Sequence, residues 1–283
     1  MIEGDQLIQK DVRRKFDRCA DNFNNYDFFH AHCRKNLFER LDLIKLKPEF
    51  ILNLGSAIGS GSEYFHRNYN DCNIINLDLS NCMLKRSVAI NNKNIHHIQA
   101  FAEFQPLVNS SVDLIFANLL MPWINNLSFF LHEIKRVLKK DGLFIFTTLG
   151  PDSLNNLKMA WSTIDNNSHV NNFIDMHIIG DQILNAGLKD PVLDNERLTV
   201  NYKNINSLID DLTNTGARNS LSNRGSHLIG KKKFREFKEN LLAMKVDGLI
   251  NVELEIIYGH AWGADSQMGP NEFHFDASKI TKR

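Results

Sequence analysis

The sequence predicts an α/β protein whose core is a doubly wound, mostly parallel sheet of seven strands. Short apolar segments alternate with helical stretches five times within about 100 residues, which is the pattern of consecutive βαβ units. Connections between parallel strands are right-handed, so this alternation winds helices over both faces of the sheet.

The composition is that of a globular protein. The 283 residues are 43% hydrophobic and 23% charged, which is too apolar for disorder. The 33 basic residues equal the 33 acidic ones, so the chain lacks the basic excess of a protein that binds nucleic acid. No apolar run approaches the roughly 20 residues that span a bilayer, and the stretch from Met1 to Arg14 has no signal-peptide core. We therefore expect a cytoplasmic protein that binds neither nucleic acid nor membrane.

The first predicted unit is an N-terminal helical cap over residues 1–48. Between residues 11 and 45, apolar residues such as Phe16, Ala20 and Phe23 recur at helical spacing, and Pro48 ends the helical region. The four cysteines have neither zinc-site nor CxxC spacing, so we expect reduced thiols and no metal site.

Five strands with intervening helices are predicted in the next hundred or so residues. A helix begins near Gly59, and Ser80 caps the helix after the second strand. Residues 112–117 are apolar throughout, as in a strand covered on both faces. A helix over 127–138 is expected to end with Gly142 in the left-handed conformation. The predicted strands cover 50–54, 73–79, 95–99, 112–117 and 143–149.

The second half is predicted to complete the sheet and to insert helices before its last strand. Residues 189–202 are expected to be extended, and the alternation in 252–258 is typical of an exposed or edge strand. A helical insertion around 204–248 is expected over the carboxyl edge of the sheet, where ligands bind in such folds. The main domain is predicted over 49–263, followed by a loosely ordered tail over 264–283. The helices expected in this half cover 151–164, 176–186, 206–215 and 231–244.

A glycine-rich turn follows the first predicted strand. Gly55, Gly59 and Gly61 let the backbone approach a ligand closely and direct helix N–H groups at it. Asp78 stands 23 residues after Gly55, in position for a carboxylate that binds both hydroxyls of a ribose. The ligand is then a dinucleotide or S-adenosylmethionine, and the spacing differs from GxGxxG, which counts against NAD. A glycine-rich turn that binds no ligand is the alternative.

Ordered motifs over residues 11–263 resemble those of a known family. They include Phe16-Asp17-Arg18-Cys19-Ala20-x-x-Phe23, the loop 51–61, Leu77-Asp78-Leu79-Ser80, Val112-Asp113-Leu114-Ile115-Phe116-Ala117-Asn118-Leu119, Glu133-x-x-Arg136-Val137-Leu138-Lys139-x-x-Gly142, Phe146-Thr147-Thr148-Leu149-Gly150-Pro151-Asp152, Asp175-Met176-His177-x-x-Gly180-Asp181 and Tyr258-Gly259-His260-Ala261-Trp262. The chain resembles the class I, Rossmann-like S-adenosylmethionine-dependent methyltransferases. More closely, it resembles the malonyl-acyl-carrier-protein O-methyltransferases of biotin synthesis, to which the motifs after Thr147 are particular.

The resemblance implies transfer of a methyl group from S-adenosylmethionine to the free carboxylate of a malonyl thioester. That carboxylate is ionised at pH 7, so no general base and no catalytic proton-transfer residue are expected. Trp123 is implied to line the acyl pocket or to pack in the core, and Arg218 and Arg224 to pair with the malonyl carboxylate or to lie on the surface. The implied cofactor-binding residues are Tyr26, Asn53, Gly55, Ser56, Ala57, Gly59, Asp78, Leu79, Phe101, Ala102, Glu103 and Asn118.

Three positions depart from the family pattern. Asn53 replaces an acid that orients the methionine end of the cofactor, and it accepts a hydrogen bond without carrying charge. Ala57 replaces a glycine, which costs about 1 kcal/mol if the site has a positive φ. Phe101 replaces an aspartate that receives the adenine amino group, so either Glu103 substitutes for it or Phe101 stacks on the ring.

The resemblance also implies an acyl-carrier protein as partner. Such carriers are acidic, so docking needs a basic surface near the mouth of the site. The first candidate is Lys231-Lys232-Lys233 with Arg235 and Lys238, and the second is Arg13-Arg14-Lys15. The alternatives are a different acceptor, as in the related arginine hydroxylase of mitochondrial complex I assembly, or a non-catalytic binding module with an altered cofactor loop.

Overall fold

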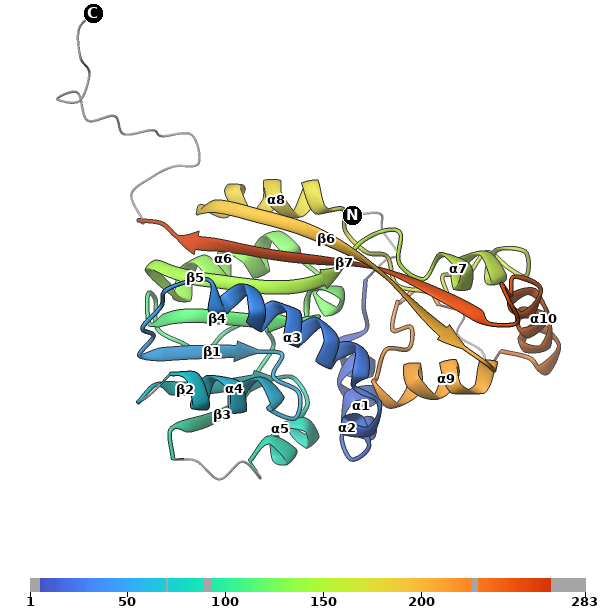
Figure 1. Ribbon diagram of the computed structural model, residues 1–283, viewed down its shortest axis with the longest axis horizontal. Helices are drawn as coiled ribbons and strands as arrows, with labels where there is room; N and C mark the ends of the chain where they lie inside the picture. Colours follow the sequence, from blue (N-terminus) through green and yellow to red (C-terminus); the bar gives the residue numbers. More distant parts are fainter. Residues whose placement is uncertain (1–5, 70, 89–92, 225–228, 266–283) are drawn as a thin grey trace, which may run out of the picture.

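The computed structural model describes residues 6–69, 71–88, 93–224 and 229–265. Seven strands form one sheet in the order β3-β2-β1-β4-β5-β7-β6 (Figure 1). Strands β1 to β5 are parallel, and β7 pairs antiparallel with both β5 and β6. The predicted doubly wound, mostly parallel sheet is therefore confirmed. The strands are β1 (Phe50–Leu54), β2 (Asn73–Asp78), β3 (Ile95–Gln99), β4 (Val112–Asn118), β5 (Leu138–Leu149), β6 (Leu188–Tyr202) and β7 (Ile250–Gly263).

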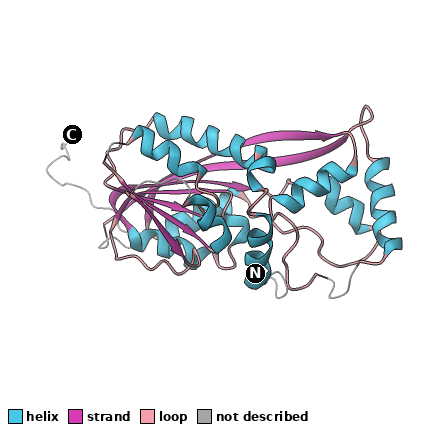
Figure 2. Ribbon diagram, turned by 90° about the horizontal axis from the view of Figure 1, so that it is seen from below, coloured by secondary structure: helices cyan, strands magenta, loops and turns pink. Residues whose placement is uncertain are grey.

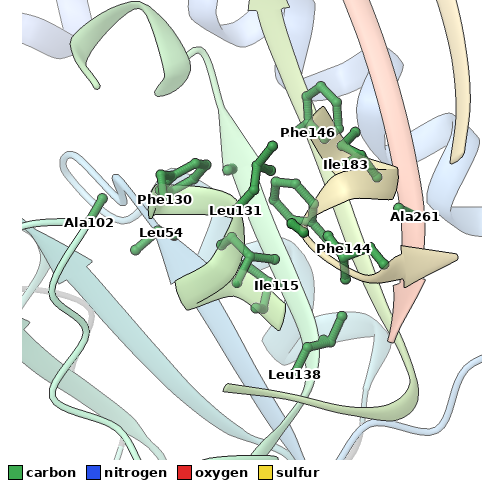
Figure 3. Packing of buried hydrophobic residues seen from close by; sticks show 14 of the residues in the cluster. Leu54, Ala102, Ile115, Phe130, Leu131, Leu138, Phe144, Phe146, Ile183 and Ala261 are labelled. Atoms are coloured by element: carbon green, nitrogen blue, oxygen red, sulfur yellow. The ribbon is translucent and has the colours of Figure 1, made fainter. Parts of the chain in front are cut away.

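Helices cover both sides of the sheet (Figure 2). On one side, Phe130 and Leu131 of α6 and Ile183 of α8 pack against Ile115 and Phe144 of the strands (Figure 3). On the other side, α3 and α4 contribute a second buried cluster. The helices are α1 (Gln9–Cys19), α2 (Phe23–Tyr26), α3 (Phe28–Asp42), α4 (Ser60–Asn68), α5 (Asn81–Ser87), the 3₁₀ helix η1 (Met121–Trp123), α6 (Leu127–Val137), α7 (Asn155–Ser162), α8 (Met176–Asn185), α9 (Ile205–Asn214) and α10 (Lys231–Ala243).

The helical insertion has a core of its own. Strands β6 and β7 continue as a long two-stranded ribbon, and α9 and α10 lie near its far end together with α7 (Figure 1). Trp161 of α7 stacks on Phe237 of α10 with 4.3 Å between ring centroids. Ile250 and Val252 of β7 belong to the same buried cluster. Burial of these apolar side chains stabilises the insertion as a unit at the carboxyl side of the sheet.

Two local predictions are wrong. The alternating strand at the end of the chain, β7, is an interior strand, and β6 forms the edge instead. Gly142 does not end a helix: α6 ends at Val137, β5 begins at the next residue, and Asp141 takes the left-handed conformation with φ +58°. Gly142 is constrained by space, because a Cβ there would lie 2.9 Å from Leu138 Cδ1 and 3.0 Å from the Asp113 carbonyl oxygen.

The predicted cap of α5 is confirmed. Ser80 Oγ accepts a hydrogen bond from the Met83 N–H at 3.2 Å and caps α5. The four cysteines are free thiols, and only Cys82 is exposed. Within the described ranges, no helix is long and apolar enough to cross a membrane. Of the predicted tail, residues 266–283 lie outside the described part of the chain.

Candidate functional site

A cavity of about 700 Å³, open mouth included, lies at the carboxyl ends of β1, β2 and β4. Helices α1, α2 and α3 close it from the N-terminal side, which is where the sequence predicts a helical cap. The side chains that these helices contribute to its wall are Gln9, Val12, Phe16, Phe23 and His30. The carboxyl edge of the strands contributes the candidate ligand-binding residues. Those that line the cavity are Gly55, Ala57, Asp78, Leu79, Phe101, Ala102, Glu103, Asn118 and Trp123.

The glycine-rich turn after β1 brings backbone to the cavity wall. Gly55 and Gly59 have φ +68° and φ +82°, and a Cβ at Gly55 would lie 3.0 Å from Leu120 Cδ1. Ala57 has φ +46°, which confirms that the residue replacing the family's glycine occupies a left-handed site. This conformation costs an alanine about 1 kcal/mol. The turn is held in place by a hydrogen bond of 2.8 Å from the Gly55 N–H to the Leu77 carbonyl.

The Asp78 carboxylate lies at the end of β2 and faces this turn. Its Oδ2 accepts from the Ala57 N–H and its Oδ1 from the Ser80 N–H, both at 2.8 Å. Burial raises the pKa of Asp78 to about 6, against the lowering effect of these hydrogen bonds. Each oxygen keeps capacity for a second hydrogen bond. The carboxylate therefore fits a ligand with two adjacent hydroxyl donors.

The segment after β3 provides the neighbouring wall. Phe101 lines the cavity and is 43% exposed, whereas Glu103 is buried. Glu103 Oε1 accepts from the Asn125 N–H at 3.1 Å, and burial raises the pKa of this carboxyl group. An aromatic residue and a buried carboxyl group thus line the same cavity as Asp78.

Asn118 and His30 form the wall near the end of β4. Asn118 Nδ2 donates to the His30 carbonyl at 3.1 Å, and Thr147 Oγ1 donates to Asn118 Oδ1 at 2.8 Å. These bonds tie α3 to the strands. His30 Nδ1 is buried, and no described residue forms a hydrogen bond with it. Burial lowers the pKa of His30 to about 4, so the ring is neutral. The sequence gives no signal for His30, because its neighbours Phe28 and Phe29 make it resemble a packing residue.

Four predicted cofactor-binding residues do not line the cavity: Tyr26, Asn53, Ser56 and Gly59. Asn53 is buried, and its Nδ2 donates to Asn76 Oδ1 at 2.9 Å and to Ser62 Oγ at 3.2 Å. The amide that replaces the family's acid is therefore part of a buried polar network beneath the turn. Its contribution is to hold β1, β2 and α4 together.

The two predicted partners of the malonyl carboxylate do not line the cavity either. Arg224 forms an ion pair with Asp11 and donates to the Asn219 carbonyl at 3.2 Å. At Arg218, the backbone carbonyl accepts from Lys15 Nζ at 2.9 Å. Both arginines thus belong to the segment that packs on α1. The charged residues among the described lining are Asp78 and Glu103, so the cavity wall is acidic.

The two basic clusters lie at different places. Lys231–Lys233 begin α10, which packs on α7 near the far end of the ribbon, and Lys233 pairs with Asp165 at 2.6 Å. None of these lysines lines the cavity. The second cluster is on α1, whose Val12 and Phe16 line the first cavity. Arg13 and Arg14 are exposed there. The lysine cluster thus does not line the cavity, and its predicted role in docking stays a prediction.

Comparison with known proteins supports the assignment of a class. A family model described as "Methyltransferase domain" matches residues 52–146. The fold is similar to that of the YcgJ protein from Bacillus subtilis, with 12% identity, a TM-score of 0.59, and coverage of 81% of this chain and 98% of that chain. It is equally similar, with a TM-score of 0.59 and 13% identity, to a Haemonchus contortus phosphoethanolamine N-methyltransferase, over 90% of this chain and 60% of that chain. The family model and the shared fold together assign the chain to the class of the methyltransferases.

Full-length relatives specify the family. The chain is 35% identical to a malonyl-[acyl-carrier protein] O-methyltransferase from a Methylovorus species, over 95% of this chain and 96% of that protein. It is 34% identical to the protein of the same name from Gallionella capsiferriformans, over 90% of this chain and 91% of that one. The chain belongs to the malonyl-[acyl-carrier protein] O-methyltransferase family.

Proposed function

We propose that this protein transfers a methyl group from S-adenosylmethionine to the free carboxylate of a malonyl thioester carried by an acyl-carrier protein. The observation that carries the proposal is the extent of the similarity to the curated relatives. It covers 90% or more of the chain and so includes the insertion as well as the nucleotide-binding half. Substrate choice in widely shared folds depends on such variable parts, because the common half serves many chemistries.

The first cavity fits the cofactor. Asp78 would accept hydrogen bonds from the two ribose hydroxyls, and the turn at Gly55 would bring backbone against the ligand. Phe101 and Glu103 would hold the adenine ring. When bound, the cofactor supplies a methyl group on a positively charged sulfur, which is an electrophile that needs no activation by the protein.

The chain's own contribution to the reaction is placement and the exclusion of water. The malonyl carboxylate is ionised at neutral pH, so its oxygen attacks without a proton being removed. Phe16, Trp123 and Leu120 give the cavity apolar walls that desolvate the reacting charges. His30 is neutral and brings no positive charge that would repel the cationic sulfur. The described wall contains no lysine or arginine. The positive sulfur of the cofactor would therefore supply the charge that attracts the attacking carboxylate.

We propose that the carrier protein docks on α1 rather than on α10. Helix α1, which lines the cavity, carries Lys10, Arg13, Arg14 and Arg18 as exposed side chains. Arg13 pairs with Asp17 and Arg14 with Asp11, and the basic residues of the helix outnumber these two acids. Lys15 points inward, donating to Ser220 Oγ at 2.7 Å, and burial lowers its pKa to about 8. A positive helix at the mouth suits the acidic surface of a carrier protein.

We place the reaction in the cytoplasm at the start of pimeloyl and biotin synthesis. The methyl ester hides the charge of the malonyl group, so that fatty-acid synthesis enzymes can elongate it. Complementation of a strain that needs biotin because it lacks this methyltransferase tests that placement.

The acceptor is tested by methyl transfer from labelled S-adenosylmethionine. Label should appear in the acyl group of malonyl-carrier protein, and none should appear with acetyl-carrier protein, which has no free carboxylate. Equal labelling of both substrates, or label on the carrier polypeptide, would refute carboxyl methylation.

A further inference from the structure

A second cavity of about 470 Å³ lies beside the first, at the carboxyl end of β5. Thr148 and Leu149 of β5 form one wall. The segment 171–174, which leads into α8, forms the opposite wall together with Ile179. The cavity is therefore built on an interior strand of the sheet and on the residues that follow it, where the family motifs are most particular.

The two cavities share a wall. Ile124 lines both of them, and Leu7 and Leu221, which line the second cavity, are joined by an isolated antiparallel bridge. Leu7 and Leu221 also pack in one cluster with Trp123, a residue of the first cavity. Because Ile124 lines both, the two cavities are adjacent, and a single ligand that occupied both would have to pass Ile124.

The chemistry of the second cavity is neutral and largely apolar. Its described lining contains no charged residue, in contrast to the acidic wall of the first cavity. Asn171 is buried, and its Oδ1 has no hydrogen-bond partner among the residues that the structure describes. An unpartnered buried carbonyl oxygen is costly, so this atom favours a ligand that brings an N–H donor. Thr148 adds a hydroxyl to the same wall.

We infer that the second cavity binds the neutral, amide-containing arm of the thioester substrate, with Asn171 Oδ1 accepting a hydrogen bond from an amide N–H. This inference rests on the proposed function, because a pantetheine arm is the uncharged, amide-bearing segment between an acyl group and its carrier. It assigns the acyl carboxylate to the first cavity and the arm to the second, so the two ends of one substrate meet walls of different polarity.

Binding of pantetheine itself is the primary test, since pantetheine carries no acyl group and is not methylated. Calorimetry on the full chain with S-adenosylhomocysteine present should show binding, and Asn171→Leu should weaken it about tenfold through loss of one hydrogen bond. Ile174→Phe, which fills the cavity, should also weaken it. Asn185→Leu, an exposed position at the other end of α8, is the matched control and should bind as wild type. Unchanged affinity for S-adenosylhomocysteine shows that each variant is folded.

Kinetics separate this inference from the proposed function. Wild type should methylate malonyl-pantetheine with a higher kcat/KM than malonyl S-ethyl thioester, which has no amide, and Asn171→Leu should remove that preference. If neither malonyl thioester is methylated while pantetheine binds in an Asn171-dependent way, the proposed acceptor is wrong and the cavity assignment stands. Absence of pantetheine binding up to its solubility limit, or equal binding by wild type and Asn171→Leu, overturns the cavity assignment.

Discussion

Replacing Asp78 by asparagine tests the centre of the first cavity. The two side chains have nearly the same shape, but the amide offers only one acceptor oxygen. In the structure, both carboxylate oxygens already accept a backbone N–H, from Ala57 and from Ser80. An asparagine would place its NH₂ group against one of these donors. We therefore expect Asp78→Asn both to lose the charged acceptor and to loosen the turn.

The size of the effect follows from the type of bond that is lost. Hydrogen bonds to a charged group contribute about 1.5–3 kcal/mol, which corresponds to a roughly 10- to 150-fold loss of affinity for S-adenosylhomocysteine.

The pH dependence of this affinity is a second signature. Because burial raises the pKa of Asp78 to about 6, the free protein binds a proton there below that pH. Ligand hydroxyls favour the ionised form, so affinity should be flat above pH 7 and should fall about tenfold per pH unit below 6.

Calorimetric titration between pH 5 and pH 8 measures both effects (a range chosen to bracket the carboxyl pKa of about 6). Asp78→Asn should bind S-adenosylhomocysteine weakly, and its affinity should no longer fall as the pH drops below 6. Glu103→Gln is the control for the other buried carboxyl group in the cavity. In this variant, affinity should still fall below pH 6. If the affinity of Asp78→Asn falls below pH 6 as steeply as that of wild type, or equals the wild-type affinity at pH 7.5, Asp78 does not hold the ligand.

Three further changes have defined outcomes. Ala57→Gly should raise the melting temperature or tighten S-adenosylhomocysteine binding by about 1 kcal/mol, because glycine has no penalty at positive φ; a loss of both would contradict the strain. The double variant Arg13→Glu/Arg14→Glu should slow methylation of malonyl-carrier protein more than that of malonyl-coenzyme A. Replacing the lysines at 231–233 by glutamate should change neither rate. If instead the lysine variant is the slower one with malonyl-carrier protein, the carrier docks on α10. Thr147→Val should lower the free energy of unfolding by about 1–3 kcal/mol in chemical denaturation, since it removes buried hydrogen bonds to the end of β4, and wild-type stability would refute that role.

The sequence predicts best what depends on local pattern. Ser80 caps α5 because its short polar side chain precedes a helical segment. The positive φ of Ala57, two residues after Gly55, agrees with the glycine that the family resemblance implies at this position. The position of Asp78 beside that turn follows from strand order alone, since parallel strands end at the same edge. These features need only neighbouring residues and the topology of a βαβ unit.

Contacts between distant parts of the chain are what the sequence does not show. Arg224 has the character of a free surface cation, yet its partner Asp11 lies 213 residues away. The alternation in β7 resembles that of an edge strand, but β6 pairs with it from Leu188 to Tyr202 and takes the edge. Asn171 carries no sequence signal of a ligand site, because only the fold brings it to a cavity at the end of β5.

The acidic wall of the first cavity has a consequence for the exchange of donor and product. At neutral pH the Asp78 carboxylate is ionised, and the described lining holds no basic side chain to neutralise it. A ligand with a cationic sulfur is attracted by this field, and the same ligand loses that attraction when its methyl group leaves and the sulfur becomes neutral. The wall therefore distinguishes fresh donor from spent donor by one unit of charge. Under the proposed function, this change of charge would weaken the binding of the spent donor and so favour its release.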